Sequence, residues 1–75
     1  MRTKINLAKI RRIRKEKGIS QTFIAKRLGY THTSGYSNIE NGRTDMKAEH
    51  LVIIAETLGV PIDDLLNEER DSLAG

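Results

Sequence analysis

The sequence contains no cysteine and no tryptophan, and it has only one proline and one phenylalanine. Without cysteine, neither a disulfide nor a thiolate zinc site can stabilise so short a chain. Seventy-five residues make one domain, near the lower size limit for a core that is held by packing alone. We therefore expect a single domain stabilised by its apolar side chains, with no metal and no cofactor.

Long apolar stretches are also missing. No run approaches the roughly 20 apolar residues that a membrane-spanning helix needs. The basic residues at 1–4 are not followed by the apolar segment of a signal peptide. The lack of cysteine agrees with a reducing compartment. These observations predict a cytoplasmic protein that does not interact with membranes.

Groups that could carry catalysis are scarce. His32 and His50 fall in different segments, and neither has a cysteine or carboxylate at metal-ligand spacing. Ser34 and Ser37 lack the setting of a nucleophilic serine, and no phosphate-binding loop is present. A bundle this small also leaves little room for a concave pocket. We expect no enzymatic activity and no small-molecule ligand.

Charge is distributed unequally along the chain. Residues 1–48 contain twelve lysines and arginines against three acidic residues, a net charge of +9. Residues 49–75 contain one arginine against seven acidic residues, a net charge of −6. A basic half suits a polyanion, and an acidic half would restrict where that polyanion docks. An ordinary solvated surface is the alternative interpretation.

Apolar residues recur at helical spacing along most of the chain, which predicts an all-α, compact five-helix bundle. Asn6 and Ser20 have N-cap side chains, and Gly18 and Gly29 suit the C-terminal ends of the first two helices. Gly35 is a poor helix former, so its backbone should closely approach DNA or a neighbouring helix. The helices are expected at 7–17, 21–28, 33–40 and 48–58, with a short fifth helix starting at Val60 and Pro61.

The segment from Ser20 to Arg43 has the pattern of two short helices joined by a tight turn. Its first helix has a small residue, Ala25, where a second helix could cross closely, and Tyr36 and Ile39 mark the buried side of the second helix. The outward side of that second helix is polar and nearly uncharged, which suits the donors and acceptors of base edges. The pattern indicates a helix-turn-helix.

At these residues the chain resembles the phage repressor/Cro-like (Xre-type) helix-turn-helix family of DNA-binding regulators. The turn between Gly29 and Tyr36 is one residue longer than in the best-known phage repressors, which leaves the first residue of the recognition helix open. The resemblance implies a lambda-repressor-like DNA-binding domain at 1–66, followed by a short acidic tail at 67–75. The matching residues are Gln21, Ala25, Leu28-Gly29 and Ile39-Glu40-Asn41-Gly42, within a resemblance that runs from about Asn6 to Leu66.

The resemblance implies sequence-specific binding to double-stranded DNA by a transcriptional regulator, with a repressor at a near-palindromic operator favoured. The recognition helix would enter the major groove, where an asparagine can pair with adenine. The loop after that helix would contact phosphates through its main-chain amides and through Arg43. The expected base contacts are Thr33, Ser34, Ser37 and Asn38, and the expected phosphate contacts are Gln21, Asn41 and Arg43. Thr33 could instead cap the helix.

Other side chains are assigned structural roles. The resemblance implies an ion pair between Arg14 and Glu40, with two separately solvated charges as the alternative. Three further charges of the first helix, Arg11, Arg12 and Lys15, are expected to point outward. Phe23 is expected in the peripheral core rather than on a base.

A homodimer is expected, because one bundle reads only a few base pairs. Its candidate contacts are Ile53, Ile62 and Leu65, which could instead complete the monomer core, Leu65 above all. A phage-type repressor, a restriction-modification controller and an antitoxin remain open as subtypes. The alternative function is a protein-interaction module or antitoxin of the same fold that binds a protein partner through its acidic half.

Overall fold

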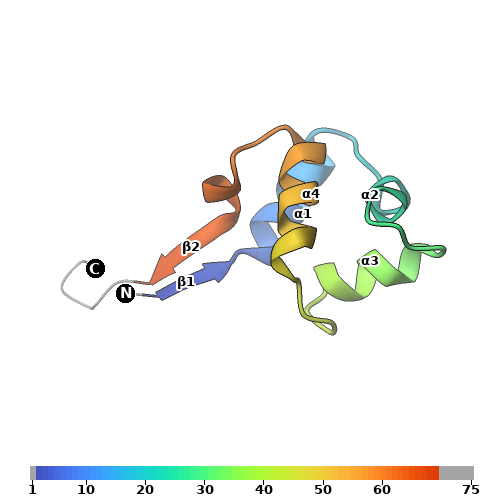
Figure 1. Cartoon of the computed structure of the whole chain (residues 1–75). Helices are drawn as coiled ribbons and strands as arrows, with labels where there is room; N and C mark the ends of the chain where they lie inside the picture. The colour runs from blue at the N-terminus through green and yellow to red at the C-terminus, as the bar shows by residue number, and fades with distance from the viewer. Residues whose placement is uncertain (1, 70–75) are drawn as a thin grey trace.

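A computed structural model describes residues 2–69 of the chain. Within that range the chain forms four α-helices, one short 3₁₀-helix and a two-stranded ribbon (Figure 1). The described part is mostly helical, as predicted, but the prediction of an all-α bundle with five helices is wrong. The elements are β1 (Arg2–Ile5), α1 (Leu7–Glu16), α2 (Gln21–Arg27), α3 (Thr33–Glu40), α4 (Ala48–Leu58), η1 (Ile62–Leu65) and β2 (Leu66–Glu69).

The predicted N-caps begin the first two helices. The side-chain oxygen of Asn6 accepts a hydrogen bond from the backbone nitrogen of Lys9 at 3.0 Å. Ser20 Oγ accepts one from the backbone nitrogen of Phe23, also at 3.0 Å. Gly29 follows α2 with a φ of 90°, a left-handed conformation that favours glycine. Each of these two helices ends one residue earlier than predicted, whereas α3 and α4 have the predicted bounds.

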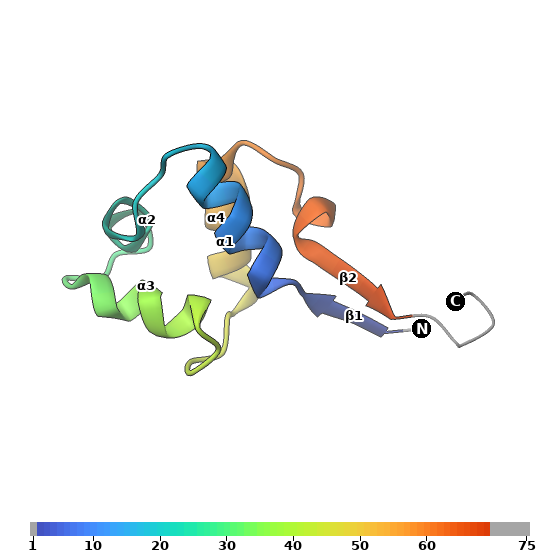
Figure 2. The same cartoon turned by 180° about the vertical axis from the view of Figure 1, so that it is seen from behind.

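The apolar core lies between the four α-helices. α2 packs against α3 and α4, and α1 packs against α3 and η1. In both views α2 and α3 form one end of the molecule, α1 and α4 its middle, and the ribbon projects from the opposite end (Figures 1 and 2). The buried hydrophobic residues are Ile10, Ile13, Ile24, Ala25, Tyr36, Ile39, Leu51, Ile54, Ala55, Leu58 and Leu65.

The predicted fifth helix is only a short 3₁₀-helix. It starts after Pro61, ends at Leu65 and is followed directly by β2. The carbonyl oxygen of Leu65 accepts a hydrogen bond from the backbone nitrogen of Asn6 at 2.8 Å. If the helix continued, that carbonyl would accept a hydrogen bond from a backbone amide of the next turn. Here the Asn6 amide takes that position, so the helix ends at Leu65. The Leu65 side chain is fully buried, and the prediction that it forms a dimer contact is therefore wrong.

The ribbon joins the two ends of the described chain. β1 and β2 pair antiparallel, with Arg2 opposite Glu69 and Ile5 opposite Leu66. A two-stranded ribbon is marginally stable on its own. Here Ile5 and Leu66 pack against the core, and this packing anchors the base of the ribbon to the helices.

The predicted boundary between domain and tail falls inside β2. Asn67 belongs to that strand, and its Oδ1 accepts a hydrogen bond from Asn6 Nδ2 at 2.9 Å. The first residues of the predicted tail at 67–75 are thus part of the fold. The rest of that tail, residues 70–75, lies outside the described residues.

Candidate nucleic-acid interface

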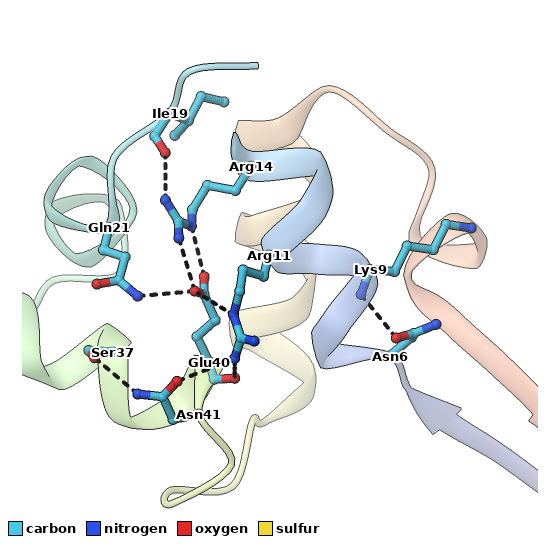
Figure 3. A network of polar contacts seen from close by, with 9 residues as sticks. All are labelled: Asn6, Lys9, Arg11, Arg14, Ile19, Gln21, Ser37, Glu40 and Asn41. Atoms are coloured by element: carbon cyan, nitrogen blue, oxygen red, sulfur yellow. Dashed lines mark hydrogen bonds and ion pairs between the residues drawn. The ribbon is translucent and has the colours of Figure 1, made fainter. Parts of the chain in front are cut away.

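Glu40, the last residue of α3, lies at the centre of a buried polar network (Figure 3). Arg14 Nε donates to Glu40 Oε2 at 2.9 Å, and Arg14 Nη2 donates to Oε1 at 3.0 Å. The third nitrogen of this guanidinium, Nη1, donates to the backbone oxygen of Ile19 at 3.0 Å. The structure thus brings Arg14 and Glu40 together as a two-point, charge-assisted pair.

Gln21 and Arg11 also reach Glu40. Gln21 Nε2 donates to Glu40 Oε1 at 3.0 Å, and Arg11 Nε lies 3.5 Å from the same oxygen. Arg11 Nη2 donates to the backbone oxygen of Glu40 at 3.4 Å and to Asn41 Oδ1 at 3.3 Å. The expectation that Arg11 simply points into solvent is therefore wrong. Gln21, a predicted phosphate contact, uses its amide nitrogen inside the protein to connect α2 with α3.

This network sets the ionisation of two buried groups. Burial alone would raise the pKa of Glu40, but hydrogen bonds from neighbours, led by Arg14, outweigh it and hold that pKa below its ordinary value of 4.5. Burial, and then the nearby Glu40 carboxylate, raise the pKa of Tyr36. The Tyr36 hydroxyl is buried and has no partner in hydrogen-bonding geometry within the described residues. At neutral pH, Glu40 is charged and Tyr36 is neutral.

The first residue of α3 contacts α2 through a hydroxyl pair. Thr33 Oγ1 and Thr22 Oγ1 lie 2.7 Å apart, which is hydrogen-bonding distance. His32 is the N-cap residue, and its side chain makes no capping hydrogen bond. The longer turn thus ends before Thr33, which is the first helical residue rather than the cap.

Gly35 is explained by the turn that precedes α3. A Cβ atom at this position would lie 2.5 Å from Tyr30 Cγ and 2.6 Å from Tyr30 Cδ1. The close neighbour within the described chain is therefore a side chain of the turn, whereas the sequence predicted a close approach to DNA or to a neighbouring helix. The Tyr30 ring also lies 6.1 Å from the His50 ring, between centroids and at a tilt of 50°. Tyr30 thus connects the turn with both α3 and α4.

The predicted base contacts share one helix but differ in exposure. Ser34 is exposed, whereas Thr33, Ser37 and Asn38 are partly buried. Ser37 Oγ accepts a long hydrogen bond from Asn41 Nδ2 at 3.4 Å. Within the described chain, the side-chain amide of Asn38 makes no hydrogen bond.

The first main-chain amides of the loop after α3 bond within the protein. The backbone oxygen of Asn38 accepts hydrogen bonds from the amides of Arg43 at 2.8 Å and Thr44 at 3.2 Å. The Gly42 amide donates to the backbone oxygen of Ile39 at 3.1 Å. These bonds cap the C-terminal end of α3, so the amides of Gly42, Arg43 and Thr44 are not available to a phosphate in this conformation. The Arg43 side chain is exposed and remains available.

Several apolar side chains remain at the surface. Phe23 is 51% exposed, so its prediction as peripheral core is wrong, and it lines a shallow hollow with Gly18, Ile19 and Ser20. Of the remaining candidate dimer contacts, Ile53 is partly buried and Ile62 is exposed.

Across residues 2–69 no helix is long and apolar enough to cross a membrane. In the same range, no group of three or more His, Cys, Asp or Glu could hold a metal ion.

The geometry around α2 and α3 is that of two short helices that pack closely across a turn. A family model described as helix-turn-helix (HTH_3) matches residues 10–65, from α1 through η1. The chain belongs to this family. Comparison with curated proteins gave no match. Helix-turn-helix proteins of this Cro/C1, Xre-like type are DNA-binding transcription regulators.

Membership of the helix-turn-helix family assigns roles to α2 and α3. In a helix-turn-helix the second helix is the recognition helix, and α3 holds that position in this helix-turn-helix regulator. The sequence did not predict that Arg11 and Tyr30 contact this helix. Arg11 lies three residues before Arg14, a spacing that puts both on the same side of a helix. That spacing was the available signal for Arg11.

Proposed function

We propose that this helix-turn-helix regulator binds double-stranded DNA sequence-specifically and represses transcription from a near-palindromic operator. The observation that carries the proposal is the surface of α3. Ser34 is exposed on its first turn and the Asn38 amide has no partner within the described chain, so uncharged polar groups are available there. Such groups suit base edges in the major groove, and the exposed Arg43 beyond them suits a phosphate.

The side chains divide into two roles. Thr33, Ser34, Ser37 and Asn38 are the proposed base contacts, and Asn38 is the most selective because an asparagine pairs bidentately with adenine. Arg43 is the strongest proposed phosphate contact. Gln21 and Asn41 are proposed as weaker phosphate contacts, since both already hold other side chains in place.

A twofold dimer supports this function, because one bundle reads too few base pairs for specificity. Its two α3 helices would lie about 34–36 Å apart, one turn of DNA. Ile53 and the exposed Ile62 are the remaining proposed contacts. Sedimentation with and without DNA tests the dimer, and a protein that stays monomeric in both conditions contradicts it.

Selection of random duplexes on the purified protein tests sequence specificity. We expect a recovered motif with two related half-sites. A variant with both Ser34→Ala and Asn38→Ala, carried through the same selection, should lose the motif while it still retains DNA. Retention of duplexes with no shared motif by the wild-type protein would show that binding is not sequence-specific.

A protein-interaction module or antitoxin is the second candidate. It is favoured by Val52 and Ile62, which are 42% and 36% exposed in the acidic half of the chain. Purification of the tagged protein from its own cells separates the two functions. One stoichiometric protein partner without a shared DNA motif favours the interaction module, and a recovered operator favours the regulator.

A further inference from the structure

Two arginines of α1 share a single carboxylate at the C-terminal end of α3. Arg14 and Arg11 both pair with Glu40, and no other carboxylate of the described chain pairs with either arginine. The cluster therefore has one positive charge in excess. The Arg14 side chain is 10% exposed and the Arg11 side chain is 42% exposed, so the excess charge lies on the Arg11 side.

The contacts of the two arginines differ in quality. Arg14 makes three hydrogen bonds of 2.9–3.0 Å, one from each guanidinium nitrogen. The Arg11 contacts are longer, from 3.3 to 3.5 Å, and they involve only Nε and Nη2. Within the described chain Nη1 of Arg11 has no partner. All three guanidinium nitrogens of Arg14 are thus engaged at short distances inside the protein, whereas Arg11 keeps Nη1 free of any partner in the described chain and can offer it to a further anion.

The Arg11 contacts also fix where that anion would bind. They hold the guanidinium beside the backbone oxygen of Glu40 and the exposed Asn41 side chain, where α3 ends and the loop to Arg43 begins (Figure 3). A guanidinium forms strong, paired hydrogen bonds with phosphate oxygens. Such bonds would more than replace the long hydrogen bonds that Arg11 makes within the protein.

We infer that Arg11 is an additional DNA phosphate contact, beside the C-terminal end of α3. The phosphate would be the second anion of the cluster that Arg11, Arg14 and Glu40 form. This inference rests on the proposed DNA binding. Arg11 would connect α1, the end of the recognition helix and the DNA backbone. Arg14, whose side chain is only 10% exposed and whose three nitrogens all bond within the protein, would keep its internal role.

The salt dependence of DNA binding tests this inference. The variants are Arg11→Gln and, as a matched control, Arg12→Gln. The Arg12 side chain is 64% exposed, and its Nε lies 3.9 Å from Oε2 of Glu16 in the same helix. The probe is a fluorescent duplex of random sequence, titrated from about 50 to about 200 mM KCl. Removal of one arginine–phosphate interaction should reduce the log–log slope by about 0.9, so the affinity of Arg11→Gln should fall roughly threefold less over this range than that of the wild type. Arg12→Gln should keep the wild-type slope.

A merely structural role for Arg11 gives a different result. Arg11→Gln would then lower the melting temperature and the affinity without changing the slope, and this outcome overturns the inference. An equal change of slope in Arg12→Gln also overturns it, because general charge would then explain both. Arg11→Lys retains the charge and should keep the slope.

The intact protein provides a second measurement if Arg11→Gln fails to fold. In an NMR titration with the same duplex, the Nε resonance of Arg11 should shift, whereas that of Arg14 should not. An unmoved Arg11 resonance in a protein that binds DNA refutes the inference alone. A wild-type protein that binds no duplex refutes the proposed function, which the two experiments thereby distinguish.

Discussion

The two ends of α3 are held by different kinds of contact. At the C-terminal end, Glu40 is buried and receives Arg14, Arg11 and Gln21. At the N-terminal end, a hydroxyl pair joins Thr33 to α2, and no charge is buried there. Because the buried charges make the C-terminal end sensitive to any loss of a partner, we interpret it as the fixed end of the recognition helix.

The difference indicates how one short helix can meet two demands. Its orientation is set by groups that are used inside the protein, so the exposed Ser34 and the Asn38 amide are left for a ligand. The charged residues, Glu40 and its arginine partners, lie at the C-terminal end of α3. The first turn is left uncharged, and such a surface suits base edges.

Removal of the buried carboxylate should have the largest effect. Glu40→Ala leaves Arg14 charged, buried and unpaired, and breaking such a pair costs about 3–5 kcal/mol. For a domain this small we expect a large fall in melting temperature, or an unfolded chain, measured by circular dichroism. A melting temperature close to that of the wild type would show that the C-terminal end of α3 is not held by this network.

Acid should weaken the same end. The pKa of Glu40 in the folded protein lies below 4.5, so its contribution to stability is complete above that value. The contribution is lost as the pH falls from about 4.5 through the lower folded pKa. Denaturant melts across this range should show the loss. A folded Glu40→Gln variant should lack this part of the pH dependence, and identical profiles in the two proteins would contradict the assignment.

A side chain at Gly35 should disturb the N-terminal half of α3. Alanine is the better helix former by about 1 kcal/mol, but its Cβ would overlap the Tyr30 ring, and overpacking costs about 1–3 kcal/mol. We expect Gly35→Ala to be destabilising overall, in chemical denaturation. The same substitution in a Tyr30→Ala background should be less harmful. Additive effects of the two changes would show that Tyr30 does not constrain this position.

Asn38→Ala and Arg43→Ala should separate base reading from phosphate binding. Loss of Asn38 should remove roughly 1–3 kcal/mol of discrimination at one base pair per half-site, with nonspecific binding almost unchanged. Loss of Arg43 should weaken all sequences alike. A panel of operator variants provides the measurement. The same profile for both variants would show that α3 is not the reading element.

The smallest effect is expected from the exposed ion pair of α1. Arg12 and Glu16 are both largely exposed, and such pairs contribute about 0–1 kcal/mol. Glu16→Gln should therefore hardly change the melting temperature. This variant is the control for Glu40→Ala, because both remove one carboxylate that pairs with an arginine of α1. A comparable loss in both variants would show that burial does not distinguish the two pairs.

Local signals in the sequence were sufficient for the four α-helices, to within one residue at the C-terminal ends of α1 and α2. The N-caps Asn6 and Ser20 and the apolar spacing of α3 and α4 depend on neighbours within a few residues. The ribbon depends on contacts between distant parts of the chain. For example, the side chains of Asn6 and Asn67 share a hydrogen bond although the two residues are 61 positions apart. Its strands are only four residues long, too short for a clear alternation of apolar and polar residues.

The same limit applies at the candidate site. A preference for helix or loop does not reveal what a side chain meets across the molecule. Helical spacing places Arg11 on the side of Arg14, but only the packing of α1 on α3 shows that both reach Glu40. The amides of Arg43 and Thr44 were expected to be free because the sequence does not show that the backbone oxygen of Asn38 accepts both of them.

The ribbon has a consequence for anything attached to this domain. Because Arg2 lies opposite Glu69, the described chain enters and leaves the fold at one place, at the end opposite α2 and α3 (Figure 1). A fluorescent protein or an affinity tag fused before Arg2 or after Glu69 would be tethered at the same point, away from the recognition helix. A short peptide linker between these two positions would close the chain into a ring without crossing the surface of α3.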